Sequence, residues 1–417
     1  MASPGPAVDL PALVRRLLDL TGGHLGVQNG DVIITGMEVN DRHGTGVLLR
    51  RLFHGAPNII SIRSCDLYDG HHEFGDIALR LPNRGQSRDA AFASVLTAMG
   101  SSTARRALCV PYYADDVRTA LAVKEIYGVP LCTYLMDDQN VCADGIPDDL
   151  MRELLAKSAL RLAISPELRV AYELKFGFKI GYMPPVVTAH LILSRLNPPP
   201  EGEPPTHGIM IGNIWGQHWL SQLRETVRGS GVTLSWYCNG RFRWVECTRE
   251  ELTADSIVPH DPVPEEELVS ALRREWFAVL PTGTLSREDD HSFIAQLSLP
   301  SRLVYLMATS QIPVLALGSP QTGAANFLKQ FGIGMVADYN RRSFLEAVEA
   351  ITQPETNLAM RRNALRAAKR FSDAGAKEWI WESLARCGPA DARYEDLMPV
   401  EMPDLTRLLA AKGRTGR

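Results

Sequence analysis

The strongest constraint on the fold of this sequence is a proline-rich break between two halves that share one pattern. Residues 184–205 contain seven prolines. Proline removes a backbone donor and restricts φ, so neither a helix nor a central strand continues through this stretch. On each side, short apolar runs alternate with helix-like stretches, a pattern typical of an α/β fold with parallel strands. A chain of 417 residues suits two domains. We predict an N-terminal domain at 1–190, a C-terminal domain at 206–370, and a final segment at 371–417.

The expected elements follow that alternation. In the first half, strands are predicted at 31–39, 58–62, 107–111, 131–135 and 162–165, and helices at 47–53, 89–99, 114–127 and 148–158. In the second half, strands are predicted at 208–214, 232–237, 256–259, 276–281, 312–317 and 334–337, and helices at 219–228, 265–275, 301–308, 324–331 and 343–351. One long helical tail is predicted at 358–387, with Trp379 and Trp381 as packing residues.

Composition excludes several classes of protein. The chain is 45% hydrophobic with a net charge of -4, so it lacks the basic surplus of a nucleic-acid-binding protein. Seven scattered cysteines without a C-x-x-C pair argue against a disulfide framework and favour a cytoplasmic location. We expect no signal peptide and no membrane span. Residues 13–20 are amphipathic and predict a packed first helix, with a peripheral membrane contact as the alternative.

The first candidate site is the loop at residues 40–46 (NDRHGTG). Ligands of open parallel sheets bind beyond the carboxyl ends of the strands, where helix N-termini present free N–H groups. Gly44 and Gly46, on either side of Thr45, would let the backbone approach a ligand closely, or would simply form a tight turn. His43 is either a donor to an acceptor hydroxyl or an exposed loop residue.

The second candidate site is the acidic pair Asp137 and Asp138, which ends the apolar run 131–136. Adjacent like charges raise the pKa of one carboxyl toward neutrality, as a general base requires. We predict a catalytic or acceptor-binding role for one of them. The alternative is an acid that caps a helix beginning at residues 139–142.

Two further candidates lie in the second half. His260 stands at a strand end within 258–263 (VPHDPV), where it either meets a planar ligand or belongs to a proline-rich turn. Thr282 and Gly283 likewise follow the end of a predicted strand, in the segment 280–284 (LPTGT), and are candidates for contact with the same ligand.

The segment 299–303 (LPSRL), which includes Pro300, predicts the N-terminus of a helix. We expect Ser301 to cap this helix and Arg302, with the free N–H groups, to hold a phosphate. The alternative is a plain capped helix with a solvated arginine.

Three segments carry a resemblance to a known family. Residues 300–318 (PSRLVYLMATSQIPVLALG), followed by 332–336, resemble the donor-binding segment of retaining-type GT-B glycosyltransferases, and residues 258–265 and 163–187 resemble two other segments of that family. The resemblance implies two Rossmann-like domains facing a cleft, with a C-terminal helix crossing back to the N-terminal domain. It also implies a nucleotide-sugar donor on the second domain, a hydroxyl acceptor mainly on the first, no cofactor beyond that co-substrate and no obligatory metal.

The resemblance also implies roles for the candidate residues. Ser301, Arg302 and Thr282 would contact the donor diphosphate, His260 would lie near the base, and the loop at Gly44–Gly46 would close over the donor. The chain departs from the family pattern twice. The paired glutamates are absent around 296–305, and no lysine or arginine occurs in 212–218 (GNIWGQH).

These departures keep other functions open. A glycosyltransferase-like subunit that binds a partner or sugar without catalysis is one alternative, and a nucleotide-sugar epimerase is another. A dehydrogenase is disfavoured because no G-x-G-x-x-G follows a strand. No oligomeric state is predicted.

Overall fold

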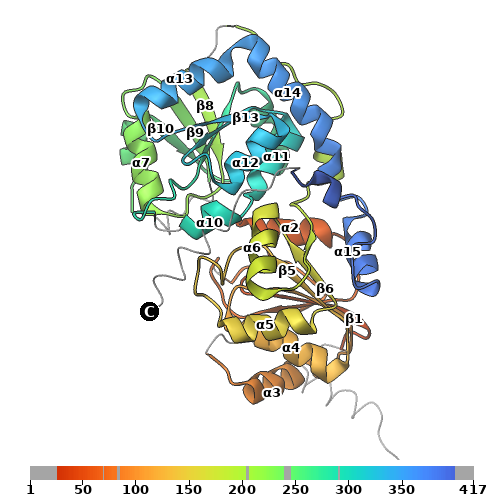
Figure 1. Cartoon of the computed structure of the whole chain (residues 1–417). Coiled ribbons are helices and arrows are strands. Elements are labelled where there is room, and N and C mark those ends of the chain that lie inside the picture. Colours follow the sequence, from red (N-terminus) through yellow and green to blue (C-terminus); the bar gives the residue numbers. More distant parts are fainter. Residues whose placement is uncertain are drawn as a thin grey trace, which may run out of the picture.

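The computed structural model describes residues 26–68, 70–81, 85–202, 206–238, 246–289 and 292–399. The described strands form two separate sheets with parallel pairing, and helices pack around both sheets (Figure 1). One sheet uses residues 30–182 and the other residues 207–337, on either side of the proline-rich stretch. The amphipathic segment 13–20 lies outside the described residues. No described helix is both long enough and apolar enough to cross a bilayer.

The first sheet has the strand order β3-β2-β1-β4-β5-β6-β7. Its order reverses between β1 and β4, the kind of position where open parallel sheets bind ligands. All residues of β1 and β5 are buried, because helices cover both faces of such a sheet. The strands are β1 Gly30–Thr35, β2 Ile59–Arg63, β3 Ile77–Arg80, β4 Ala104–Val110, β5 Leu131–Leu135, β6 Leu160–Ala163 and β7 Gly181–Tyr182, and the helices are α2 Gly44–Leu52, α3 Arg88–Met99, α4 Ala114–Tyr127, α5 Asp148–Lys157 and α6 Pro166–Phe176.

The second sheet repeats this topology as β10-β9-β8-β11-β12-β13. Here the order reverses between β8 and β11. The strands are β8 His207–Ile211, β9 Thr233–Tyr237, β10 Ile257–His260, β11 Ala278–Pro281, β12 Val314–Leu317 and β13 Gly334–Ala337, and the helices are α7 Gln217–Val227, α8 Arg249–Ala254, α9 Glu265–Arg273, α10 Ser292–Leu297, α11 Ser301–Ser310, α12 Gly323–Phe331, α13 Arg341–Thr352 and α14 Pro354–Ala368.

The C-terminal segment returns to the first domain, as the resemblance implies, but the prediction of one long tail helix at 358–387 was wrong. Helix α14 ends at Ala368, and a separate helix, α15, spans Ala376–Ala385. Between them lie a short 3-10 helix at Lys369–Phe371 and the extended residue Ser372, which pairs with Val187 in a parallel bridge. A turn at Gly375, with φ of +72°, then starts α15.

Both tryptophans of α15 are packing residues. Trp379 and Trp381 are buried. The ring of Trp381 lies 5.5 Å from that of Phe53 in the first domain, and the guanidinium of Arg106 lies 4.1 Å from the Trp381 ring centre. These contacts attach the end of the chain to the N-terminal domain.

The carboxyl edges of the two sheets face each other where the domains meet. In Figure 1, α2 and α6 of the lower domain lie against α11 and α10 of the upper domain. Polar pairs cross this junction. Glu167 of α6 accepts from Asn326 of α12 at 2.8 Å, and Arg51 of α2 pairs with Glu265 of α9 at 2.8 Å.

Candidate functional site

Two helix N-termini, one from each domain, meet at the junction. Helix α2 begins at Gly44 and α11 at Ser301, and a methyl group added to Gly44 would lie 2.9 Å from the Oγ of Ser301. Neither helix has an acidic residue in its first turn. Because a helix N-terminus carries partial positive charge, this junction favours an anion.

Helix α11 does not begin as the sequence suggested. Pro300 is the N-cap residue, Ser301 is the first helical residue, and no side chain caps the helix. The prediction that Ser301 caps α11 was wrong because Pro300 already occupies that position and has no side-chain acceptor. The first amide groups of α11 therefore lack a side-chain partner among the described residues.

Helix α2, in contrast, is capped by His43. The Nδ1 atom of His43 accepts from the amide of Gly46 at 3.3 Å, and Nε2 lies 2.6 Å from the carbonyl oxygen of Glu38. This pairing requires a neutral ring that donates through Nε2, and burial lowers the pKa of His43 accordingly. Both ring nitrogens thus have protein partners, and acceptor binding by His43 stays a prediction. Gly46 is required sterically, since a Cβ there would lie 2.4 Å from the carbonyl oxygen of Asn40.

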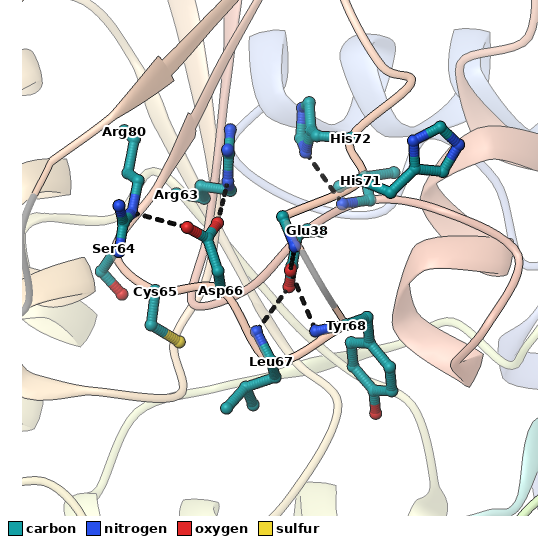
Figure 2. A network of polar contacts seen from close by, with 12 residues as sticks. Glu38, Arg63, Ser64, Cys65, Asp66, Leu67, Tyr68, His71, His72 and Arg80 are labelled. Carbon is teal, nitrogen blue, oxygen red and sulfur yellow. Dashed lines mark hydrogen bonds and ion pairs between the residues drawn. The ribbon is translucent and has the colours of Figure 1, made fainter. Parts of the chain in front are cut away.

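A buried carboxylate supports that cap from behind. Glu38 is fully buried, and its Oε1 accepts from the amides of Tyr68 at 2.9 Å and Gly70 at 2.7 Å, while Oε2 accepts from Leu67 at 2.8 Å (Figure 2). The loop held in this way places the ring of Tyr68 in a parallel stack on His43, with ring centres 4.6 Å apart. Glu38 therefore holds the loop whose Tyr68 ring packs on His43, the residue that caps α2.

A second carboxylate network holds the start of the same loop. Figure 2 shows Asp66 between Arg63 and Arg80, at 2.9 and 3.0 Å. Arg63 ends β2 and Arg80 ends β3, so this network ties the loop to the edge of the first sheet. The two networks together hold residues 66–70, the part of the loop that carries Tyr68, in place against His43.

The adjacent acids Asp137 and Asp138 have different surroundings. Asp138 is fully buried, and its two oxygens accept from four backbone amides, those of Asn140, Val141, Cys142 and Ala143. It holds the loop after β5, so its hydrogen-bonding capacity is used within the protein. Of these two adjacent acids, Asp137 is the one whose carboxylate reaches residues at the junction.

Asp137 lies in a short chain of polar side chains that leads to α2. Its Oδ2 accepts from the hydroxyl of Tyr112 at 2.9 Å, and that hydroxyl pairs with Thr45 in the first turn of α2. Burial raises the pKa of Asp137, while Ser298 of the second domain and Tyr112 oppose this shift. A carboxyl with a raised pKa beside a positive helix end is suited to proton transfer.

Arg302 supplies a half-buried positive charge at the end of β8. Its Nη1 donates to the carbonyl oxygens of Ile211 at 3.1 Å and Asn213 at 2.9 Å. Burial lowers its pKa to about 10, and within the described ranges no carboxylate pairs with it. The turn at 212–218 has no lysine or arginine of its own, and Arg302 from α11 places a guanidinium there. Its charge therefore remains available to an anion.

The remaining predicted residues lie along the carboxyl edge of the second sheet. Thr282 and Gly283 follow β11, the neighbour of β8, and the Thr282 carbonyl accepts from the hydroxyl of Tyr339 at 2.8 Å. His260 ends the edge strand β10 and stacks on Tyr237, with ring centres 4.6 Å apart.

The structure thus gathers Gly44, Thr45, Asp137, Ser301 and Arg302 at the junction and places His260 farther along the edge. Sequence reasoning missed Tyr112 and Asn213. Each follows the end of a strand, β4 or β8, as Asp137 follows β5, and this signal could have found them. In the part of the chain that the structure describes, no group of three or more His, Cys, Asp or Glu side chains is placed to hold a metal ion.

Comparison with known proteins supports the architecture. No protein-family model and no curated protein matches the sequence. Among solved structures, HepE of Anabaena in complex with UDP superposes with a TM-score of 0.59 at 15% identity, covering 86% of this chain and all of the other. WaaG, a glycosyltransferase involved in lipopolysaccharide biosynthesis, gives 0.54 at 10% identity over 85% and 99% of the two chains. A UDP-N-acetylglucosamine 2-epimerase gives 0.51 at 12% identity over 91% and 99%. With its two Rossmann-like sheets and returning C-terminal helix, the chain has the GT-B fold.

Proposed function

We propose that this protein is a glycosyltransferase that moves a sugar from a nucleoside diphosphate sugar to a hydroxyl group. One observation carries the proposal: Arg302, a half-buried guanidinium without a carboxylate partner among the described residues, lies in the first turn of a helix that faces the start of α2. Helix N-termini and arginine together bind phosphate groups well. We place the donor diphosphate at this junction.

Asp137 is the proposed base. The acceptor hydroxyl oxygen would bond to the anomeric carbon of the sugar as the bond from that carbon to the diphosphate oxygen breaks. The hydroxyl proton would pass to Asp137, whose pKa is raised by burial and which Tyr112 orients. Arg302 and the two helix ends would stabilise the charge that develops on the leaving diphosphate. This assignment applies to a transfer with inversion.

We propose a UDP-sugar as the first donor to test, because the superposed HepE structure contains UDP. The diphosphate would need no metal ion, since Arg302 and the helix ends supply positive charge. The acceptor would bind on the N-terminal side, next to Asp137. A cytoplasmic location suits a donor of this class, and we keep it as part of the proposal.

Ligand-induced thermal stabilisation tests the donor site. A nucleotide at one hundred times its dissociation constant stabilises the folded state by about 2.7 kcal/mol. UDP, GDP, dTDP, CMP and their sugar conjugates would be compared with EDTA present. We expect UDP or a UDP-sugar to raise the melting temperature, and Arg302→Ala to remove that shift.

Arg273→Ala is the matched control. Arg273 is also a partly buried arginine that donates to backbone carbonyls, those of Thr309 at 2.9 Å and Leu191 at 3.4 Å, but it lies at the opposite end of α11. It should lower the melting temperature without removing the ligand shift. An equal ligand shift in Arg302→Ala and the wild type would refute the donor site.

A second candidate is a nucleotide-sugar epimerase, because the fold also superposes on a UDP-N-acetylglucosamine 2-epimerase. That reaction needs no acceptor. Incubation with UDP-N-acetylglucosamine alone, followed by chromatography of the intact nucleotide sugar, separates the two candidates. A new nucleotide-sugar isomer would favour the epimerase, while UDP release that depends on an added acceptor would favour transfer.

A further inference from the structure

Four polar side chains form an unbroken line across one face of the second sheet. The Oε2 atom of Glu275 lies 3.1 Å from Nδ1 of His207, and Nε2 of His207 lies 3.0 Å from the Oγ of Ser235. The same Oγ lies 3.1 Å from Nε2 of His260. The line begins at the amino end of β8 and reaches the carboxyl end of β10.

The register of the strands explains this arrangement. Ser235 on β9 is opposite Ile209 on β8 and Val258 on β10. His207 and His260 each lie two residues from those partners, in opposite directions, so they take the two diagonal positions around Ser235. Alternate residues of a strand share a face, which puts all three side chains on the same side of the sheet.

The chemistry of the serine hydroxyl couples the two rings. A hydroxyl has one proton, so Ser235 can donate to one histidine only, and the other must donate to it. When His207 is neutral and donates to Glu275 through Nδ1, its Nε2 accepts the Ser235 proton. Ser235 then accepts from Nε2 of His260, which leaves Nδ1 of His260 as an acceptor.

Protonation of His207 leaves its bond to Glu275 unchanged and reverses the two bonds that involve Ser235. Nε2 of His207 then donates to Ser235, and Ser235 donates to Nε2 of His260. A neutral His260 must in that state carry its proton on Nδ1, which becomes a donor. No described residue pairs with this Nδ1.

We infer that Glu275, His207 and Ser235 are positioning residues that set whether Nδ1 of His260 accepts or donates a hydrogen bond, and so select the base of the bound nucleotide. This inference rests on the proposed function and on the expectation from the family resemblance that His260 lies near the nucleotide base. With the relay neutral, His260 selects a base that donates at its ring N3, as uracil does. With the relay protonated, it selects a base that accepts at N3, as cytosine does.

The charges around the relay favour the protonated state of His207. The hydrogen bond to Glu275 raises the pKa of His207 above its ordinary 6.5. The ion pair is therefore present below that value and is lost as pH rises through the raised pKa. On the His260 side, Tyr237 covers one ring face, and Arg249 of α8 is paired with Asp261. Because that pair is internally neutralised, His207 is the group that drives the reversal.

Nitrogen-15 NMR of labelled histidines tests the relay directly. We expect His260 to change from the Nδ1–H to the Nε2–H tautomer as pH rises through the pKa of His207. Glu275→Gln should move that change to lower pH, and Ser235→Ala should uncouple the two rings. Thr233→Ala, two residues earlier on the same face of β9, is the matched control and should behave as wild type. An identical His260 tautomer in wild type and Ser235→Ala at every pH would overturn the inference.

Nucleotide binding tests the selectivity. The ratio of the dissociation constants of CDP and UDP should rise about tenfold with pH in the wild type and in Thr233→Ala, and should stay flat in Ser235→Ala. A flat ratio in the wild type alongside a coupled tautomer would overturn the selection of the base. If neither nucleotide bound the wild type, the proposed function and the base selection would both fail, while the NMR result would still decide the relay.

Discussion

The carboxyl edges of the two sheets share one topology but use buried charge in opposite ways. At the first edge, Glu38 and Asp138 are fully buried, and their oxygens accept from backbone amides, those of a neighbouring loop for Glu38 and those of its own loop for Asp138. At the second edge, the charge at the end of β8 is the half-buried Arg302, which meets only backbone carbonyl oxygens among the described residues. A carboxylate with four amide partners has little left for a ligand, whereas a cation that meets only carbonyl dipoles remains attractive to an anion. The strand order shared by the two sheets therefore determines where a ligand site can lie. The hydrogen-bond partners of each charged side chain determine whether that side chain holds a loop or remains available to a ligand.

Asp137 is the exception at the first edge, and its replacement is expected to have the largest effect. Asp137→Asn keeps the shape of the side chain but removes the base, so transfer should slow by a factor of about 10² to 10⁴. In the wild type, the rate should fall as pH drops toward the raised pKa of Asp137, because the protonated carboxyl cannot accept the acceptor proton. The residual rate of the variant should lack this fall. Initial rates of acceptor-dependent UDP release measure both effects, and an unchanged rate would remove Asp137 from the mechanism.

Asp138→Ala tests the structural half of the comparison. Four backbone amides, two of them fully buried, would lose their acceptor, so the free energy of unfolding should drop by about 3 kcal/mol. Urea unfolding measures this loss. Glu346→Ala, which breaks only an exposed ion pair with Arg342, should cost less than about 1 kcal/mol. If Asp138→Ala were as stable as that control, Asp138 would not hold its loop and the contrast with Asp137 would collapse.

Gly44→Ala probes the place where the two edges meet and should have the smallest effect. The new methyl group would lie 2.9 Å from the Oγ of Ser301 but 3.9 Å from its Cβ. We expect a loss of about 1 kcal/mol in the free energy of unfolding, because the two helix starts must separate or Ser301 must rotate. The double variant Gly44→Ala/Ser301→Ala should recover that loss, and urea unfolding of all three variants completes the cycle. No recovery would mean that the two termini are not in contact.

Much of the fold could be predicted from sequence because buried parallel strands are apolar throughout. Strand β5 and helix α4 lie where the apolar pattern placed them. Strand β3 was missed because it is half exposed and lacks a buried run. The tail helix was predicted too long because its interruption depends on pairing with Val187, which is far away in the sequence.

The candidate site was less accessible to sequence reasoning. Position after a strand identified Asp137, Asp138 and the glycine loop. The difference between the two acids depends on which backbone amides surround each of them, and no residue pattern records that. Glu38 was missed for the same reason, since its partners are amides about thirty residues away.

The bridge between Val187 and Ser372 has a consequence for motion. The chain passes between the domains twice, once through the proline-rich stretch and once after α14, and the two passages are joined by backbone hydrogen bonds of 2.8 and 2.9 Å. Ala189 adds a third bond, to the Oδ1 of Asp373, at 2.9 Å. Because the two crossings are joined by hydrogen bonds, we expect them to act as one hinge. A twist of one domain relative to the other would break those bonds. Opening of the junction between α2 and α11 is thereby confined to a swing about a single axis, and a proteolytic cut in either crossing alone would leave the domains attached.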